Sequence, residues 1–259
     1  MKKILYSNGD SFVAGMECLG DDDRSEGNKQ FAFPKIIADA LNCQLYINNS
    51  YNGATNNFIF NQTIFDLLEL EQQGYKPSEI FVVVGFTSLY RIDIDGQSWF
   101  NKLAGFDLNS EKMQGDLPVE YIDHKLLFVN PSAALIAQDL QTNEKFSLGD
   151  DVIPFCTQYL WTDEVQVPNQ EARLIALHSF LKSKGYDHIF VNTCQEIKNT
   201  KYVDMTCKNF YYLNYTSMYE FGSVEYPTEI KKSNHFTPLV HKKYAEKLID
   251  YIKTQGLIS

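Results

Sequence analysis

The sequence predicts an α/β fold built on a parallel sheet, because three apolar runs alternate with two helical segments. Residues 2–7, 43–48 and 80–85 are predicted strands, and the last (IFVVVG) is the continuous β-branched run typical of a buried parallel strand. Residues 31–41 space their apolar positions as an amphipathic helix does, and a second helix is expected at 56–73. Strand, helix, strand, helix, strand in this order indicates right-handed βαβ units.

The second half of the chain continues the pattern with one more strand and several helices. A strand is predicted at residues 187–193 (DHIFVNT), and helices are predicted at 131–140, 151–161, 165–184 and 238–253. The apolar residues of the two longer helices lie at helical spacing, which indicates packing against the core and not a cofactor site.

Three stretches interrupt the alternation. Residues 93–130 lack a helical period and are expected to be an insertion of short strands or loops over the sheet's edge. Residues 196–230 are irregular and rich in tyrosine, which fits either stacking on a sugar or plain packing. Residues 12–30 are predicted to be a polar loop, in which Asp21–Asp23 are solvated, because three adjacent Asp converge on a cation only within a shaped turn. No repeat or linker divides residues 1–259, so a single domain is predicted.

Composition excludes several classes of function. The chain has 259 residues and a net charge of −10, so it lacks the excess of Lys and Arg that nucleic acid or an anionic membrane requires. Its five cysteines are widely spaced without Cys-x-x-Cys, which predicts reduced thiols and neither a zinc site nor disulfides. No apolar run is long enough for a signal peptide or a membrane span, so a cytoplasmic protein is expected.

The first strand runs directly into Gly9-Asp10-Ser11, and this places a serine at the carboxyl edge of the predicted sheet. Open α/β sheets build their sites at that edge, although the same tripeptide also fits an ordinary turn. Two further loops, Asn52-Gly53 and Gly85–Ser88, follow the next two strands and reach the same edge. A nucleophilic serine there would have backbone amides around it.

A nucleophilic serine needs a base, and His235, just before the last helix, is the candidate. The amides of Ser11 and Gly53 are candidate donors to the developing oxyanion, because glycine lets the backbone approach a substrate closely. Alone, His235 also fits a solvent-facing residue at a helix entrance. The remaining histidines lack the spacing of metal ligands, so no metal site is predicted: His124, His178, His188 and His241.

Taken in order, these segments resemble the SGNH (GDSL-type) hydrolase superfamily over nearly the whole chain. The first block of that family, a strand leading to G-D-S, is matched by Gly9-Asp10-Ser11. The second, an Asn/Gly loop with a key glycine, is matched at residues 49–55 with Gly53. The last is matched by His235, followed by Pro238 and His241 before the final helix.

The resemblance implies a three-layer α/β/α sandwich with a mostly parallel, flavodoxin-like sheet. It also implies that Ser11 is the nucleophile, that His235 is the general base and that no cofactor is needed. The Ser11 and Gly53 amides would form part of the oxyanion hole, at a site that also includes Asp10. His241 is expected to be a packing or capping residue inside the last helix.

The chain departs from this family at two positions. The third block of the family is G-x-N-D, and here Thr87 stands where the oxyanion-donating Asn belongs, with Asn56 or Asn57 as a candidate substitute. Loss of one oxyanion donor typically costs about 2.7–4 kcal/mol of transition-state stabilisation. The family also places an Asp three residues before its His, where this chain has Lys232.

Lysine cannot accept the imidazole N–H, so another group has to orient His235. The candidates are a backbone carbonyl, a carboxylate such as Asp10 or Glu229, or no partner at all. The pattern Gly85-Phe86-Thr87-Ser88 with Arg91 nearby also resembles GDSL-like proteins of bacteriophages, which implies a viral or bacterial origin and a possible virion location.

Two functions remain open from the sequence. The first is a serine hydrolase that cleaves a small-molecule or glycan acyl ester, such as an acetyl group on a carbohydrate, through an acyl-enzyme on Ser11. The second is a catalytically impaired module of the same fold that binds glycans or builds a virion, and Thr87 and Lys232 motivate it.

Overall fold

The protein is described here by a computed structural model. It covers residues 2–20, 25–88, 91–95, 126–130, 136–139, 145–147, 163–194, 201–204, 206–211, 217–231 and 234–258, with the backbone alone at residues 92–147 and at Asp163.

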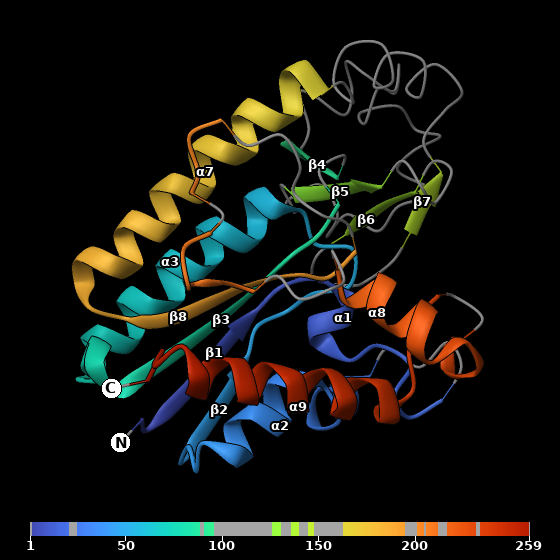
Figure 1. Cartoon of the computed structure of the whole chain (residues 1–259). Helices are drawn as coiled ribbons and strands as arrows, with labels where there is room; N and C mark the ends of the chain where they lie inside the picture. Colours follow the sequence, from blue (N-terminus) through green and yellow to red (C-terminus); the bar gives the residue numbers. More distant parts are fainter. Residues whose placement is uncertain are drawn as a thin grey trace.

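Within these residues, five parallel strands form the central sheet in the order β2-β1-β3-β8-β9 (Figure 1). Their bounds are β1 Ile4–Asn8, β2 Leu45–Asn48, β3 Ile80–Phe86, β8 Asp187–Asn192 and β9 Phe210–Tyr211. This is the strand order of flavodoxin-like doubly wound sheets. It confirms the predicted fold class, including the strands expected at residues 2–7, 43–48, 80–85 and 187–193.

Helices cover both faces of the sheet and complete three layers (Figure 1). The first face carries α3 (Asn56–Gln72) and α7 (Asp163–Lys184). The second face carries α2 (Phe33–Ala40), α8 (Met218–Glu225) and α9 (Pro238–Thr254). All of these helices except α8 were predicted from the sequence.

The central strand β3 explains why the core has two halves. Its seven residues are all buried. Val82 and Val84 pack among the apolar side chains of α3 and α7, whereas Phe81 and Val83 pack among those of α2 and α9. Successive side chains of a strand point to opposite faces, so a continuous apolar run supplies both layers at once.

An antiparallel sheet follows β3, in the order β4-β5-β6-β7 among the described residues. Its strands are β4 Ile92–Asp95, β5 Leu126–Asn130, β6 Ile136–Asp139 and β7 Lys145–Ser147. The short strands expected in residues 93–130 are therefore present, and the sheet continues beyond that range. The helix predicted at 131–140 is wrong over β6, because hydrogen bonding to β5 and β7 overrides a local apolar pattern that also fits a helix. The helix predicted at 151–161 lies outside the described residues.

Several shorter elements occur where loops were expected. The stretch 12–30 contains α1 (Ser11–Ala14) and a 3₁₀ helix at Glu26–Gln30, and Asp21–Asp23 lie outside the described residues. The tyrosine-rich stretch contains β9 and α8, with a 3₁₀ helix at Pro227–Glu229. A further 3₁₀ helix at Pro77–Glu79 leads into β3.

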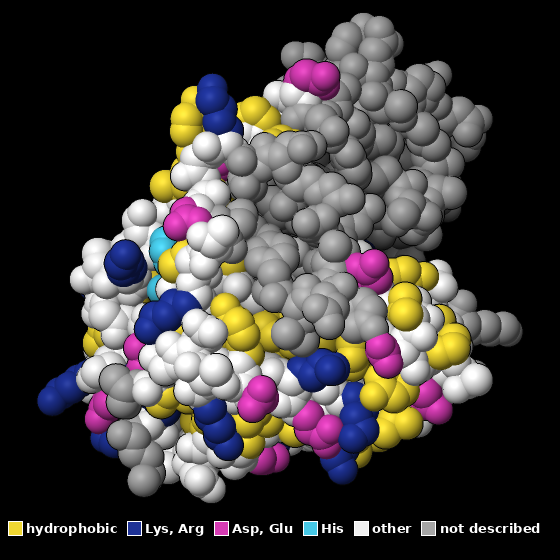
Figure 2. Space-filling view, in the orientation of Figure 1, with side chains coloured by type: hydrophobic (Ala, Val, Ile, Leu, Met, Phe, Trp, Pro, Cys, Tyr) yellow, Lys and Arg dark blue, Asp and Glu magenta, His cyan; other side chains and the backbone are white. Residues whose placement is uncertain are grey.

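The surface carries charges of both signs. On the face shown in Figure 2, the described Lys and Arg side chains are interspersed with Asp and Glu and form no continuous basic patch. Among the described helices, none combines the length and the apolar character that crossing a membrane requires.

A pair of histidines joins α7 to β8. His178 Nδ1 lies 2.9 Å from His188 Nε2, and His188 Nδ1 lies 2.9 Å from the carbonyl oxygen of Tyr186. No group of three or more His, Cys, Asp or Glu side chains that could hold a metal ion occurs in the described part of the chain. Burial lowers the pKa of His188 from 6.5 to about 4, so the neutral pair belongs to the folded state.

His188 makes the stability of the fold depend on pH. The unfolded chain binds a proton on this residue near pH 6.5 and the folded chain only near pH 4, so the free energy of unfolding falls as pH drops through this window. We expect His188 to lower the free energy of unfolding by roughly 2–3 kcal/mol across this window. The stabilising contribution of neutral His188 is fully present only above the pKa of the unfolded chain. Urea unfolding from pH 7 to 4 should show a shallower loss for His188→Gln than for wild type, and parallel curves would contradict the assignment.

Candidate active site

Ser11 lies at the carboxyl end of β1, where it begins the short helix α1. Asp10 is the N-cap of that helix, and its Oδ1 accepts a hydrogen bond from the Phe12 N–H at 3.1 Å. β1 has β2 on one side and β3 on the other, so Ser11 sits where the chain reverses its direction of travel across the sheet. Such switch points are where open α/β sheets bind ligands.

A notch between two glycines holds α1 against the sheet. A Cβ atom on Gly9 would lie 2.2 Å from Val13 Cγ2, and one on Gly85 would lie 2.3 Å from the same methyl. Both distances are far below van der Waals contact, so the buried Val13 side chain fits only because both positions lack a side chain. The close fit fixes α1, and with it Ser11, relative to β1 and β3.

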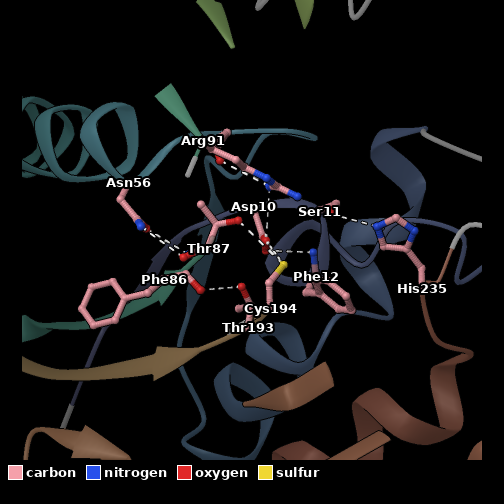
Figure 3. A network of polar contacts seen from close by, with 11 residues as sticks. Asp10, Ser11, Phe12, Asn56, Phe86, Thr87, Arg91, Thr193, Cys194 and His235 are labelled. Carbon is pink, nitrogen blue, oxygen red and sulfur yellow. Dashed lines mark hydrogen bonds and ion pairs between the residues drawn. The ribbon is translucent and has the colours of Figure 1, made fainter. Parts of the chain in front are cut away.

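His235 is brought to Ser11 from the opposite end of the chain. Its Nε2 lies 2.8 Å from Ser11 Oγ, a hydrogen-bonding distance (Figure 3). The His235 ring packs against Phe12, with 5.1 Å between ring centroids, so the residue after the nucleophile also supports the base. Asn234, with φ at 66°, turns the chain immediately before His235. The two residues that the sequence singled out are thus in contact.

Glu17 lies on the other side of the His235 ring. Its Oε2 is 3.5 Å from His235 Nδ1, and its side chain is completely buried. Glu17 adopts a φ of 66°, in the left-handed region that costs a non-glycine residue about 1 kcal/mol. This turn, just after α1, directs a buried carboxylate at the nitrogen that does not face Ser11.

The carboxylates near His235 can be compared as the group that orients its ring. Lys232, which stands where the family has its Asp, lies outside the described residues. Glu229 accepts a hydrogen bond from Thr237 Oγ1, and the Asp10 carboxylate is held by other partners. Glu17 is therefore the carboxylate beside the imidazole, and neither of the two carboxylates proposed from the sequence takes that place.

Asp10 is the anchor of a buried polar cluster beside Ser11 (Figure 3). It is fully buried, and its Oδ2 accepts a hydrogen bond from Cys194 Sγ at 3.0 Å and faces Arg91 Nη1 at 3.5 Å. Burial, together with the neighbouring Asp10 charge, raises the pKa of the Cys194 thiol to about 12. Cys194 is therefore a neutral hydrogen-bond donor here. Asp10 holds the loop in shape from within the protein.

Thr87 and Asn56 are paired with each other. The Asn56 side chain accepts a hydrogen bond from the Thr87 N–H at 2.9 Å and donates one to the Thr87 carbonyl at 3.1 Å. The Thr87 hydroxyl donates to Cys194 Sγ at 3.7 Å, and both side chains are buried. Asn56 thus fixes the loop after β3, and its amide is engaged in the bonds that do so.

Gly53 lies in the turn before α3 and has a φ of 78°, a conformation that glycine adopts without strain. The Tyr51 N–H donates to the carbonyl of Gly9 at 3.2 Å, and this bond ties the Gly53 loop to the Ser11 loop. The two loops therefore meet at the edge where both were expected.

His241 takes the structural role expected of it. It is buried in α9, where its Nδ1 accepts a hydrogen bond from the Phe33 N–H at 3.3 Å. Burial lowers the pKa of His241 to about 3, so it remains neutral. Among the tyrosines of the irregular stretch, Tyr202 is exposed, Tyr211 is in the core and Tyr219 packs against Phe12.

Glu17 and Cys194 were missed in the sequence, and Arg91 was noted only for a resemblance. A signal for Glu17 was present, because residues 12–19 (FVAGMECL) are apolar or glycine except for this one acid. A lone carboxylate in an apolar stretch next to a candidate nucleophile indicates a buried, partnered charge. No local signal marks Cys194, whose role depends on β8 lying beside β3.

No protein-family model matches the chain, and no curated protein matches it. The chain is similar to a solved carbohydrate esterase whose active site displays divergent catalytic and non-catalytic binding functions, at 14% identity and a TM-score of 0.44, over 100% of this chain and 71% of that chain. It is similar to phospholipase A1 from Streptomyces albidoflavus NA297 at 13% identity and a TM-score of 0.32, over 98% and 75% of the two chains.

A third similarity is to a catalytic mutant of Axe2, an acetylxylan esterase from Geobacillus stearothermophilus, at 10% identity and a TM-score of 0.35, over 96% of this chain and 94% of that chain. Two of these proteins are esterases and one is a phospholipase. At such identities and TM-scores the similarities do not decide the activity of this chain, so its chemistry rests on its own residues.

The glycine notch predicts a specific pattern of stability. Gly85→Ala should lower the free energy of unfolding by about 1–3 kcal/mol, because the new methyl collides with Val13. Adding Val13→Ala should recover part of that loss, so the two changes should be non-additive in urea unfolding. Gly20→Ala is the control, since a Cβ there meets nothing within 4 Å. Equal effects of Gly85→Ala and Gly20→Ala would contradict the packing described here.

Proposed function

We propose that this protein is a serine ester hydrolase with Ser11 as nucleophile and His235 as general base. The observation that carries the proposal is the 2.8 Å contact between Ser11 Oγ and His235 Nε2 at the switch point of the sheet. A serine within hydrogen-bond reach of an imidazole, itself oriented by a third group, is the arrangement that activates a hydroxyl. Glu17, 3.5 Å from His235 Nδ1, is that third group.

The reaction follows from these contacts. Ser11 Oγ forms a bond to the ester carbonyl carbon while its proton moves to His235 Nε2, and the carbonyl oxygen becomes the oxyanion. The bond to the alcohol then breaks, and the alcohol leaves with the proton from His235. Water attacks the acyl-enzyme, its proton passes to His235, and the acid is released as Ser11 recovers its proton. The Glu17 carboxylate, 3.5 Å from Nδ1, stabilises the imidazolium electrostatically in both halves.

The proposed substrate is a small acyl ester, such as an acetyl group on a carbohydrate. It follows from the resemblance to SGNH hydrolases, and an acidic chain without an excess of cations is consistent with an uncharged ester. A cytoplasmic or virion location remains an expectation from the sequence. The competing function is a binding module of the same fold, favoured by Thr87 in place of the Asn donor and by the engagement of its hydroxyl with Cys194.

Hydrolysis of p-nitrophenyl acetate separates these two functions. The purified protein should release p-nitrophenol, and Ser11→Ala and His235→Ala should each lower kcat by at least about 10³-fold, since the nucleophile and its base act as a unit. Ser183→Ala, at an exposed serine of α7, should leave the rate unchanged. Activity that survives in Ser11→Ala would contradict the mechanism, and a folded but inactive wild type would favour the binding module.

Glu17 should act by orienting and charge-stabilising His235. Glu17→Gln keeps the shape of the side chain and removes its charge, so kcat should fall by about 10²-fold or more. The acid limb of the kcat/KM profile should also move to lower pH, because the imidazolium loses its anionic neighbour.

The matched control is Glu69→Gln, at an exposed position of α3. A purely structural role for Glu17 would lower stability and the amount of active protein but leave the midpoint of the pH profile where it is. An unmoved midpoint in a well-folded Glu17→Gln variant would therefore rule out the orienting role.

A further inference from the structure

The oxyanion hole of the proposed hydrolase lacks the Asn donor of the family, and two of the side chains considered in its place, Thr87 and Asn56, are occupied. The Thr87 hydroxyl donates to Cys194 Sγ, and its side chain is only 1% exposed. The Asn56 amide is bonded to the backbone of Thr87 at both its oxygen and its nitrogen, and Asn56 is fully buried. Neither side chain can reach a substrate without breaking these bonds.

Arg91 contacts both of the loops that carry the predicted donor amides. Its Nη1 lies 3.5 Å from Asp10 Oδ2 and 3.4 Å from the carbonyl oxygen of Ala54. Asp10 directly precedes Ser11, and Ala54 directly follows Gly53. The guanidinium therefore bridges the two loops whose amides are expected to bind the oxyanion, and in Figure 3 it points along the sheet edge toward Ser11.

Among the described residues, the guanidinium makes its polar contacts through Nη1. The Arg91 side chain is only 10% exposed, and its Nε is buried with no hydrogen-bond partner in the described part of the chain. Burying a donor without a partner is unfavourable, so this nitrogen is a candidate to bind a ligand oxygen. Nε and Nη2 form one flat edge of the guanidinium, whose geometry suits an anionic oxygen.

The surrounding contacts fix this charge before any substrate binds. Asp10 is itself held by the Phe12 N–H and by Cys194, so the carboxylate that faces Arg91 cannot turn away. A preorganised donor stabilises a developing charge without reorganisation during the reaction. A charged donor also makes a hydrogen bond roughly twice as strong as a neutral one, which would compensate for the missing Asn.

We propose that Arg91 is the third oxyanion donor of this site, with Asp10 as the residue that positions it. The inference rests on the proposed ester hydrolysis and names the group that stabilises its transition state. Arg91 holds the oxyanion together with the amides of Ser11 and Gly53, while Thr87 is confined to the loop that supports them.

The test compares Arg91→Ala, Arg91→Lys and the exposed control Arg173→Ala in the hydrolysis of p-nitrophenyl acetate. Arg91→Ala should lower kcat by about 10²–10³-fold with little change in KM, because the interaction forms mainly in the transition state. Added millimolar guanidinium chloride should restore part of that kcat and should leave Arg173→Ala unaffected. Arg91→Lys keeps a positive charge beside Asp10, so this variant is expected to fold like wild type. Its kcat should nevertheless fall, because lysine lacks the planar edge of the guanidinium.

The outcomes distinguish failure of the Arg91 donor role from failure of the proposed ester hydrolysis. Wild type that shows no Ser11-dependent turnover overturns the hydrolase and the donor together. Ser11-dependent wild type with Arg91→Lys within a few-fold of its kcat overturns the donor alone. The donor role is also overturned if Arg91→Ala raises the KM for esters that carry a carboxylate and leaves kcat unchanged. Arg91 would then be a substrate-binding residue. Loss of kcat with rescue by guanidinium supports the proposal.

Discussion

The hydrogen bond between Ser11 and His235 is the contact on which the site depends, and it joins residues 224 positions apart. The parallel sheet makes this hydrogen bond possible. β1 ends at the switch point, and α9, which follows His235, packs beside α2 on one face of the same sheet. Phe12 links the placement of Ser11 to the placement of His235. It belongs to the helix that presents Ser11, and its ring supports the imidazole of His235. The packing of the fold and the alignment of the site are therefore the same set of contacts.

Two buried carboxylates near Ser11 are kept apart by their neighbours and take different parts. Asp10 receives the Phe12 N–H, the Cys194 thiol and the Arg91 guanidinium, so its charge is used inside the protein. Glu17 is turned by its left-handed backbone toward His235. A buried carboxylate is tolerated only when it is paired or hydrogen-bonded. The partners of each acid thus define what it does, an anchor in one case and an orienting group in the other.

The sequence was sufficient for the parts of the molecule that local patterns govern. β3 could be predicted because its run is apolar on both faces, and Ser11 and His235 could be paired because both lie at the edge of a parallel sheet. Glu17 stands out in the sequence as a lone acid in an apolar stretch, but its contact with His235 could not be predicted, because that contact depends on a left-handed turn and on a partner far along the chain. The strand β6 was mistaken for a helix, since a short apolar run fits either state until β5 supplies hydrogen bonds. The replacement of an Asn by Thr87 was visible, but the engagement of its hydroxyl was not.

An activated Ser11 should react with a fluorophosphonate probe, and this reaction can be followed by intact mass measurement and peptide mapping without knowledge of the substrate. We expect a single adduct on Ser11 in wild type, little labelling in Ser11→Ala and slow labelling in His235→Ala. A well-folded wild type that acquires no adduct, or that carries the adduct on another serine, would contradict the proposed activation of Ser11.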